Sequence, residues 1–170
     1  MTAGIKTERK WLVSALTLES FAVKKIILQE QGYIAPPSGK RGFLRLRLEE
    51  DIDGKGAPRY LLTIKSADVL NEDPPDHEIS KREFTILWPW TEGRRVKKRR
   101  QVIELDGRLY DYDTYIFASD PELYILESEF DDEEAAASFV LPEAFGKSRD
   151  VSNDPRYKAN SIATNGRPLD

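Results

Sequence analysis

Hydrophobic and polar residues alternate with a period of two along most of this chain. Short alternating segments that are rich in β-branched and aromatic residues are typical of half-buried β-strands. Proline, glycine or acidic turn residues interrupt the alternation at residues 35–42, 51–58, 69–76, 90–93 and 119–121. The pattern predicts strands at residues 43–48, 60–65, 83–88, 96–104, 109–117 and 123–130. These segments together predict a mainly β fold.

Two segments break the alternation, and we expect both to be helical. Residues 17–29 carry apolar side chains at a spacing that suits a helix. Residues 131–140 open with acidic residues and continue with alanines, so Asp131 or Asp132 can cap a helix whose positive end lies beside the acids. The polar tail that follows predicts a turn at Asp154 and one further short helix.

Composition excludes several classes of site. The chain has 170 residues, which fits one domain, and it has no cysteine, so disulfides, thiolate metal sites and cysteine nucleophiles are excluded. Its one histidine, His77, lies in an acidic, proline-containing stretch and is expected to be a solvated loop residue, not a zinc ligand or a triad base. No apolar run approaches the roughly 20 residues that span a bilayer, and residues 1–10 lack the apolar core of a signal peptide. We therefore expect a cytoplasmic protein without a membrane partner.

The charges are segregated along the chain, although the net charge is only −4. Residues 94–100 are strongly basic, whereas residues 109–134 contain many acids and neither lysine nor arginine. Side chains two residues apart in a strand share one face of the sheet. Five expected strands place two charges on one face in this way: Glu8 with Lys10, Arg45 with Arg47, Lys98 with Arg100, Asp111 with Asp113, and Glu127 with Glu129.

Both signs of charge are explained if the ligand is a polyphosphate with a divalent metal ion. Guanidinium groups match phosphate oxygens, and carboxylates are the hard ligands that Mg²⁺ or Mn²⁺ requires. Curvature of the sheet would enclose these charges in an aqueous interior, with helices covering the apolar outer face. Two alternatives remain at this point: an exposed charged face with weak cross-strand ion pairs, and a nucleic-acid-binding β-barrel that uses residues 94–100. The abundant acid disfavours a nucleic-acid partner, because it would repel a phosphodiester backbone.

Several short motifs occur in an order that resembles a known family. Glu8-Arg9-Lys10-Trp11-Leu12-Val13 resembles the N-terminal Glu-x-Glu-x-Lys signature of the CYTH, or triphosphate tunnel metalloenzyme, superfamily. The other motifs follow in the family's order: Gln31-Gly32-Tyr33-Ile34, Leu44-Arg45-Leu46-Arg47, Leu62-Thr63-Ile64-Lys65, Lys98-Arg99-Arg100, Tyr110-Asp111-Tyr112-Asp113 and Glu127-Ser128-Glu129-Phe130. Each motif is weak alone, but the ordered set runs from Glu8 to about Ala163 and is specific.

The resemblance implies an eight-stranded antiparallel β-barrel or tunnel with a few flanking helices. It implies a single domain over residues 1–170, with flexible ends at residues 1–4 and 164–170. Basic residues would clasp a triphosphate-containing small molecule, and glutamates would hold one or two divalent cations, Mg²⁺ or Mn²⁺. Known members include inorganic, thiamine and RNA triphosphatases and class IV adenylate cyclases. A homodimer is one assembly compatible with this interpretation.

The matching positions give candidate roles to individual residues. The resemblance implies phosphate contacts for Lys10, Arg45, Arg47, Lys65, Lys98 and Arg100. It implies metal contacts for Glu8, Glu127 and Glu129, with Asp113 and Glu83 as secondary candidates. The candidates for catalysis at the reacting phosphoryl group are Lys10, Lys65 and Lys98, together with Tyr33, which could equally be a packed aromatic residue.

Two positions depart from the family pattern. Lys6 replaces the first signature glutamate, and Thr85 replaces the second glutamate of a segment, residues 81–85, that resembles the family's Arg-x-Glu-x-Glu strand. One metal ion could still bind, since Mg²⁺ keeps several water ligands. Three functions are expected, in this order: hydrolysis of a triphosphate, which is widespread in the family, cyclisation of ATP, for which the sequence marks no purine pocket, and triphosphate sensing with little or no turnover, which Lys6 and Thr85 support.

Overall fold

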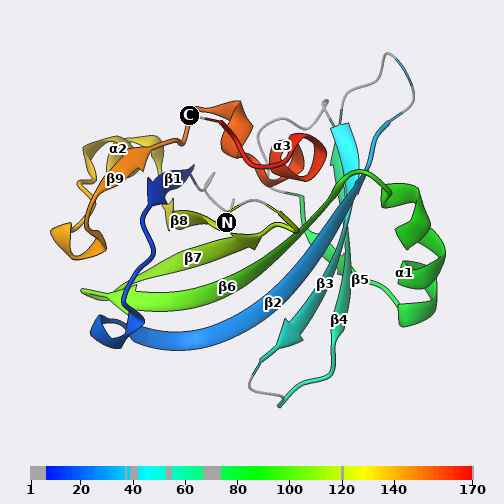
Figure 1. The fold of residues 1–170 in the computed structure, drawn as a ribbon, viewed down its shortest axis with the longest axis horizontal. Helices are drawn as coiled ribbons and strands as arrows, with labels where there is room; N and C mark the ends of the chain where they lie inside the picture. Colours follow the sequence, from blue (N-terminus) through cyan, green and yellow to red (C-terminus); the bar gives the residue numbers. More distant parts are fainter. Residues whose placement is uncertain are drawn as a thin grey trace.

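The computed structural model describes residues 7–36, 38, 42–52, 55–66, 74–119 and 121–169. Its centre is a nine-stranded antiparallel sheet in the order β5-β4-β3-β2-β6-β7-β8-β1-β9 (Figure 1). The strands are β1 (Thr7–Val13), β2 (Ala22–Ile34), β3 (Gly42–Asp51), β4 (Arg59–Ser66), β5 (Asp76–Glu78), β6 (Arg95–Leu105), β7 (Arg108–Ile116), β8 (Leu123–Phe130) and β9 (Ser148–Asp150). The helices are α1 (Lys81–Leu87), α2 (Glu133–Ser138) and α3 (Ala159–Asn165), with 3₁₀ turns η1 (Leu18–Ser20), η2 (Trp88–Thr91), η3 (Glu143–Phe145) and η4 (Pro155–Tyr157).

The sheet curls, so that its two faces have different environments. Figure 1 shows β2, β6 and β7 sweeping through the bend, with β3 and β4 at one side and β8 and β1 at the other. Helix α3 packs against β6 and β2 on the inner face of the curl. None of the helices in the described ranges is long and apolar enough to cross a membrane.

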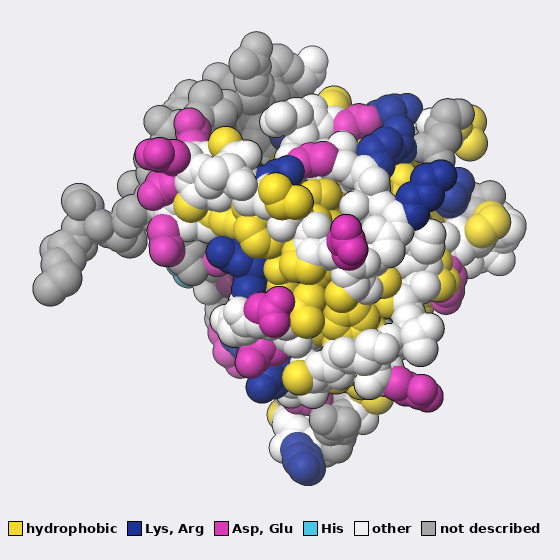
Figure 2. All heavy atoms as spheres, turned by 90° about the vertical axis from the view of Figure 1, so that its left-hand side faces the viewer, with side chains coloured by type: hydrophobic (Ala, Val, Ile, Leu, Met, Phe, Trp, Pro, Cys, Tyr) yellow, Lys and Arg dark blue, Asp and Glu magenta, His cyan; other side chains and the backbone are white. Residues whose placement is uncertain are grey.

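The outer face of β1, β6, β7 and β8 carries the larger aromatic core. Trp11, Tyr110, Tyr112 and Phe130 alternate with the inner-face residues and form one cluster with Phe145 of η3, whose ring centroid lies 4.7 Å from that of Tyr110. Helix α2 also covers this face, and Asp132 caps it by accepting a hydrogen bond from the backbone amide of residue 135. Figure 2, which views the molecule from the left of Figure 1, shows hydrophobic side chains gathered on this side. The outer face is therefore apolar, as the alternation predicts.

The inner face is apolar at one end and charged elsewhere. Tyr33, Val96, Tyr115 and Ile125 form the apolar end with residues of α3, among them Ile162. The same strands carry charged side chains two or four residues further along, because residues of equal parity share a face. Helix α3 thus closes one end of the inner face, and the charged part lies beside it.

Five of the predicted strands and the helix at residues 131–140 are confirmed within a few residues, but three expectations are wrong. The segment at residues 17–29 is a 3₁₀ turn followed by the first part of β2, and residues 83–88 lie in α1 and η2. The sheet has nine strands, not eight. Pairing between its edge strands β5 and β9, which a closed barrel requires, is not found among the described residues.

Candidate functional site

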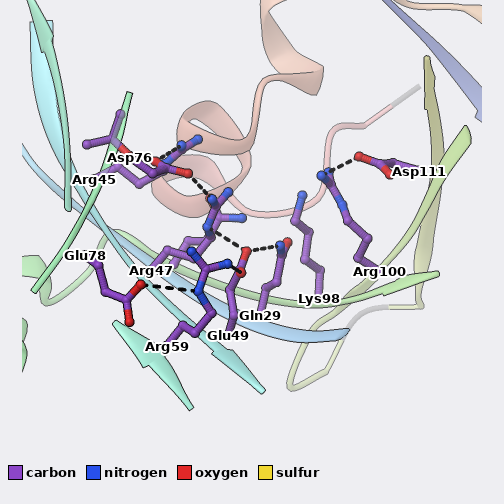
Figure 3. Close-up of polar contacts among 12 residues, drawn as sticks. Gln29, Arg45, Arg47, Glu49, Arg59, Asp76, Glu78, Lys98, Arg100 and Asp111 are labelled. Atoms are coloured by element: carbon purple, nitrogen blue, oxygen red, sulfur yellow. Dashed lines mark hydrogen bonds and ion pairs between the residues drawn. The ribbon is translucent and has the colours of Figure 1, made fainter. Parts of the chain in front are cut away.

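Charged side chains on the inner face form two groups. We define the buried cluster as Lys10, Lys98, Arg100, Asp113 and Glu127, and the edge cluster as Arg45, Arg47, Glu49, Thr63 and Asp76. Strand register creates both groups, because Arg100 lies opposite Asp113, Lys10 lies opposite Glu127, and Thr63 lies opposite both Arg45 and Asp76. Figure 3 shows Lys98 on β6 between the side chains of the edge cluster and Arg100.

The buried cluster is a continuous network of ion pairs. The Lys98 Nζ lies 2.5 Å from Asp113 Oδ2, and Arg100 donates to both oxygens of Asp113, with Nε to Oδ1 at 2.7 Å and Nη2 to Oδ2 at 2.6 Å. Arg100 Nη2 also donates to Glu127 Oε2 at 2.8 Å, and Lys10 Nζ donates to Glu127 Oε1 at 2.5 Å. Asp113 and Glu127 therefore hold three cations in one place.

Burial and neighbouring charge shift the pKa values in this cluster in different directions. Burial alone would raise the pKa of Glu127, but Lys10, Lys98 and Arg100 together hold it far below its usual value. Burial and the charge of Arg100 lower the pKa of Lys98. Burial would also lower the pKa of Lys10, but its contacts with Glu127 and Glu8 raise it above the ordinary value. At neutral pH Glu127 is thus ionised among cations.

The edge cluster is organised around the carboxylate of Asp76 on β5. Asp76 Oδ1 accepts from Arg45 Nη2 at 3.0 Å and from the Thr63 hydroxyl, while Oδ2 accepts from Arg47 Nη2. On its other side, Arg47 Nε lies 3.0 Å from Glu49 Oε1. Burial and the nearby Arg45 lower the pKa of Arg47. Two arginines are therefore held side by side on the inner face.

Carboxylates line an open cavity of about 690 Å³ beside the buried cluster. Glu8, Asp111, Glu127 and Glu129 contribute to its wall, together with Arg100. Burial first, and then the charge of Glu127, raise the pKa of Glu8, although Lys10 and Arg100 act in the opposite direction. Among the described residues no three acidic or histidine side chains converge closely enough to form a metal site, since the oxygens of Glu127 are turned to Lys10 and Arg100. The type and location of the donors nevertheless suit a hard divalent cation.

The structure brings most of the predicted site residues together. Lys10, Lys98, Arg100, Asp113 and Glu127 form the buried cluster, and Arg45 and Arg47 belong to the edge cluster, as described above. Glu8 contacts Lys10, and Glu129 lies opposite Glu8 in the β1–β8 ladder.

Three candidates lie apart from these contacts. Lys65 follows Thr63 on the inner face of β4 but is exposed. The Tyr33 hydroxyl donates to Gln31 Oε1 at 3.1 Å, and burial raises the pKa of Tyr33 to about 12. Glu83 lies on α1, where its carboxylate accepts from the amide and hydroxyl of Ser80 in a capping box. Lys6 lies outside the described residues.

Two acids of the edge cluster, Asp76 and Glu49, were not among the predicted site residues. Asp76 begins a three-residue strand inside a stretch expected to be a loop, and Glu49 lies just beyond the predicted end of its strand. No hydrophobic pattern marks β5, because Asp76, His77 and Glu78 are all polar and exposed. Thr85, expected on the inner face, lies instead on α1 and donates its hydroxyl to the Lys81 carbonyl. Asp76 is therefore an acid of the inner face that residues 83 and 85 do not provide.

Comparison with known proteins adds relatives that span nearly the whole chain. No family model matches it. An inorganic triphosphatase from Nitrosomonas europaea is 35% identical over 157 residues, which are 92% of this chain and 95% of the relative.

Two solved structures are also similar to this chain over most of its length. A crystal structure of the inorganic triphosphatase NE1496 is 34% identical, with a TM-score of 0.63 over 94% of each chain. The PH1819 protein from Pyrococcus horikoshii OT3 shares the fold at 18% identity, with a TM-score of 0.52 over 76% of this chain and 80% of its own. The chain belongs to the CYTH, or triphosphate tunnel metalloenzyme, superfamily.

Proposed function

We propose that this protein hydrolyses a triphosphate bound on the inner face of the sheet, with the help of a divalent metal ion. The observation that carries the proposal is the gathering of Lys10, Lys98 and Arg100 around two carboxylates, next to an acid-lined cavity. The 35% identity to an inorganic triphosphatase supports hydrolysis of an inorganic triphosphate in particular.

The cations would bind by exchanging protein carboxylates for phosphate oxygens. Charge-assisted hydrogen bonds from arginine and lysine serve either partner, so the network of ion pairs already holds the donors in place. Arg45, Arg47, Lys98 and Arg100 would provide most of the affinity. Lys10 and Lys65 would lie nearer the reacting phosphoryl group and offset the negative charge that develops on it.

Glu8, Glu127 and Glu129 would hold the metal ion. All three line one cavity, and burial together with the charge of Glu127 disfavours the ionised form of Glu8, which a bound cation would stabilise. When bound, Mg²⁺ or Mn²⁺ would act as a Lewis acid on phosphoryl oxygens. Contact of phosphate with Lys10 and Arg100 would release the oxygens of Glu127 for this role.

One observation that favoured a sensor without turnover, the absence of a carboxylate at Thr85, no longer does so. Thr85 lies on α1, so its lack of a carboxylate removes no acid from the inner face. We therefore rank hydrolysis above sensing.

The test is to supply tripolyphosphate, ATP and thiamine triphosphate with Mg²⁺ or Mn²⁺, and to measure orthophosphate, pyrophosphate and cyclic AMP together. We expect metal-dependent release of orthophosphate. Glu129→Gln should lower this rate at least about tenfold and raise the metal concentration needed for half-maximal rate. Glu134→Gln, which changes an exposed residue of α2, is the matched control. Pyrophosphate with cyclic AMP would establish a cyclase instead, and binding without any product would establish a sensor.

A further inference from the structure

Asp76 occupies the donor groups that a phosphate would need in the edge cluster. Its two carboxylate oxygens accept from different guanidinium groups, those of Arg45 and Arg47 (Figure 3). Thr63 donates a third hydrogen bond to the same carboxylate. Two oxygens on one centre, spread over two arginines, reproduce the contacts that a phosphoryl group makes with such a pair.

Asp76 remains a competitor at neutral pH because it stays ionised. Burial alone would raise its pKa, but the hydrogen bond from Thr63 and the charges of Arg47 and Arg45 lower it below its ordinary value. A phosphate group approaching these arginines therefore meets donors that already serve a carboxylate. It must displace at least one of the two contacts before it can use both guanidinium groups.

The position of Asp76 in the fold makes such a displacement easy. Strand β5 has three residues, all exposed, and forms the edge of the sheet next to β4. The Asp76 side chain is 29% exposed, whereas that of Asp113 in the buried cluster is fully enclosed. Solvent can replace the contacts of Asp76, so moving it away costs little compared with uncovering a buried carboxylate.

We propose that Asp76 is an internal competitor for the phosphate chain at Arg45 and Arg47, which sets substrate affinity and helps to expel phosphate products. This inference rests on the proposed function. A ligand that also reaches Lys98, two strands away at roughly 10 Å, compensates for displacing Asp76 with added contacts. A short product that contacts only the edge cluster has no such compensation. The Asp76 carboxylate then displaces it by binding Arg45 and Arg47 again.

Asp76→Asn separates the competitor from the scaffold. Asparagine keeps the shape and an acceptor for Thr63 but removes the charge that holds the two arginines. With metal chelated by EDTA, titration calorimetry should show tripolyphosphate and pyrophosphate binding about tenfold more tightly to the variant than to the original protein. With metal present, KM should fall, and inhibition by pyrophosphate should strengthen by a similar factor.

Two further variants serve as a control and as a second substitution at residue 76. Glu78→Gln alters the same strand at a side chain that pairs with Arg59, not with Arg45 or Arg47, and should leave metal-free affinity within about twofold. Asp76→Ser removes the carboxylate and also the side-chain carbonyl that asparagine would keep as an acceptor, and it should tighten binding as well. Thermal unfolding of each variant, compared with the original protein, identifies any loss of fold.

Metal-free affinity that is unchanged or weaker in both Asp76 variants would overturn the inference. If Asp76→Asn instead raised only the metal requirement, Asp76 would be a metal ligand and the inference would also fail. Hydrolysis by the original protein would leave the proposed function standing in either case. If the original protein neither bound nor hydrolysed tripolyphosphate, the proposed function and this inference would fall together.

Discussion

In the buried cluster, the Asp113 carboxylate is enclosed by Lys98 and Arg100, and the Lys98 side chain itself is only 4% exposed. In the edge cluster, the equivalent carboxylate of Asp76 lies between Arg45 and Arg47, but solvent reaches both it and Arg45. In both places an aspartate bridges two cationic side chains, but the cations are Lys98 and Arg100 in one cluster and two arginines in the other, and the two aspartates differ in depth. The exposed carboxylate of Asp76 can therefore exchange its partners at a lower cost than the enclosed carboxylate of Asp113.

Depth decides how each cluster responds to a lost charge. Removing one partner of a buried pair leaves the other desolvated and uncompensated, which costs about 3–5 kcal/mol, whereas an exposed pair contributes about 0–1 kcal/mol. We therefore expect the buried cluster to govern folding as well as binding. The edge cluster, in which Arg45 and Asp76 are more exposed but Arg47 is not, should govern binding with a smaller effect on folding.

The largest effect is expected from Lys98→Met. It leaves Asp113 with Arg100 as its remaining cationic partner and should lower the free energy of unfolding by about 3 kcal/mol, measured by urea denaturation. The double variant Lys98→Met/Asp113→Asn should recover part of this loss, because the buried negative charge is then gone. A loss below about 1 kcal/mol in the single variant would show that the two clusters do not differ as described.

The second effect is a pH dependence that originates in Glu127. Its pKa in the folded protein lies below the ordinary value of 4.5, so the unfolded chain binds more protons as the pH falls through that value. Stability should be fully present above about pH 4.5 and should decline below it. Unfolding in EDTA at a series of pH values measures this decline, and Glu127→Gln should reduce the slope. An unaltered slope would assign the acid sensitivity to other carboxylates.

The third effect sharpens the comparison from the side of the edge cluster. Arg47→Gln should weaken tripolyphosphate binding about 10- to 100-fold, because hydrogen bonds to charged groups contribute about 1.5–3 kcal/mol each. Because the Arg47 side chain is 13% exposed and also pairs with Glu49, the same change should lower the free energy of unfolding by about 1–2 kcal/mol, less than the loss in Lys98→Met. Arg59→Gln, at a more exposed arginine that also lies near Glu49, is the matched control. A large loss of stability in Arg47→Gln would make the edge cluster structural.

For the buried cluster, period-two alternation predicted which charges share a face within each strand, as with Lys98 and Arg100. The ordered motifs implied that these faces form one site, and the register of β6, β7 and β8 brings Lys98, Asp113 and Glu127 to the same face. Strand β2 was missed for the opposite reason. A register shift between Val23 and Lys25 breaks its alternation, and its inner positions include the buried polar residues Gln29 and Gln31.

Strand β5 and helix α1 show the limit of hydrophobic patterning more clearly. Three exposed residues contain no apolar periodicity, so Asp76 could not be placed before the tertiary contact with β4 was known. For α1 a local signal existed, since Ser80 and Glu83 form the Ser-x-x-Glu capping box that begins a helix. The prediction of a strand at residues 83–88 did not take this signal into account. It therefore placed Glu83 and Thr85 on the inner face of the sheet, whereas both lie on α1.

The smallest effect is expected where the two kinds of environment meet, at Glu8. Burial and Glu127 raise its pKa above 4.5, so the folded protein holds a proton there that the unfolded chain has lost, and stability falls as the pH rises through this interval. Glu8→Gln removes that cost and should stabilise the metal-free protein at neutral pH. The gain should stay below about 1 kcal/mol, because the side chain is 42% exposed and solvent screens it. Mg²⁺ should reverse the order by stabilising the original protein more than the variant, which thermal unfolding with and without metal would reveal. If the variant is less stable in EDTA, the contact of Glu8 with Lys10 outweighs its repulsion from Glu127. Lys10 would then already neutralise the acids of the cavity without a metal ion.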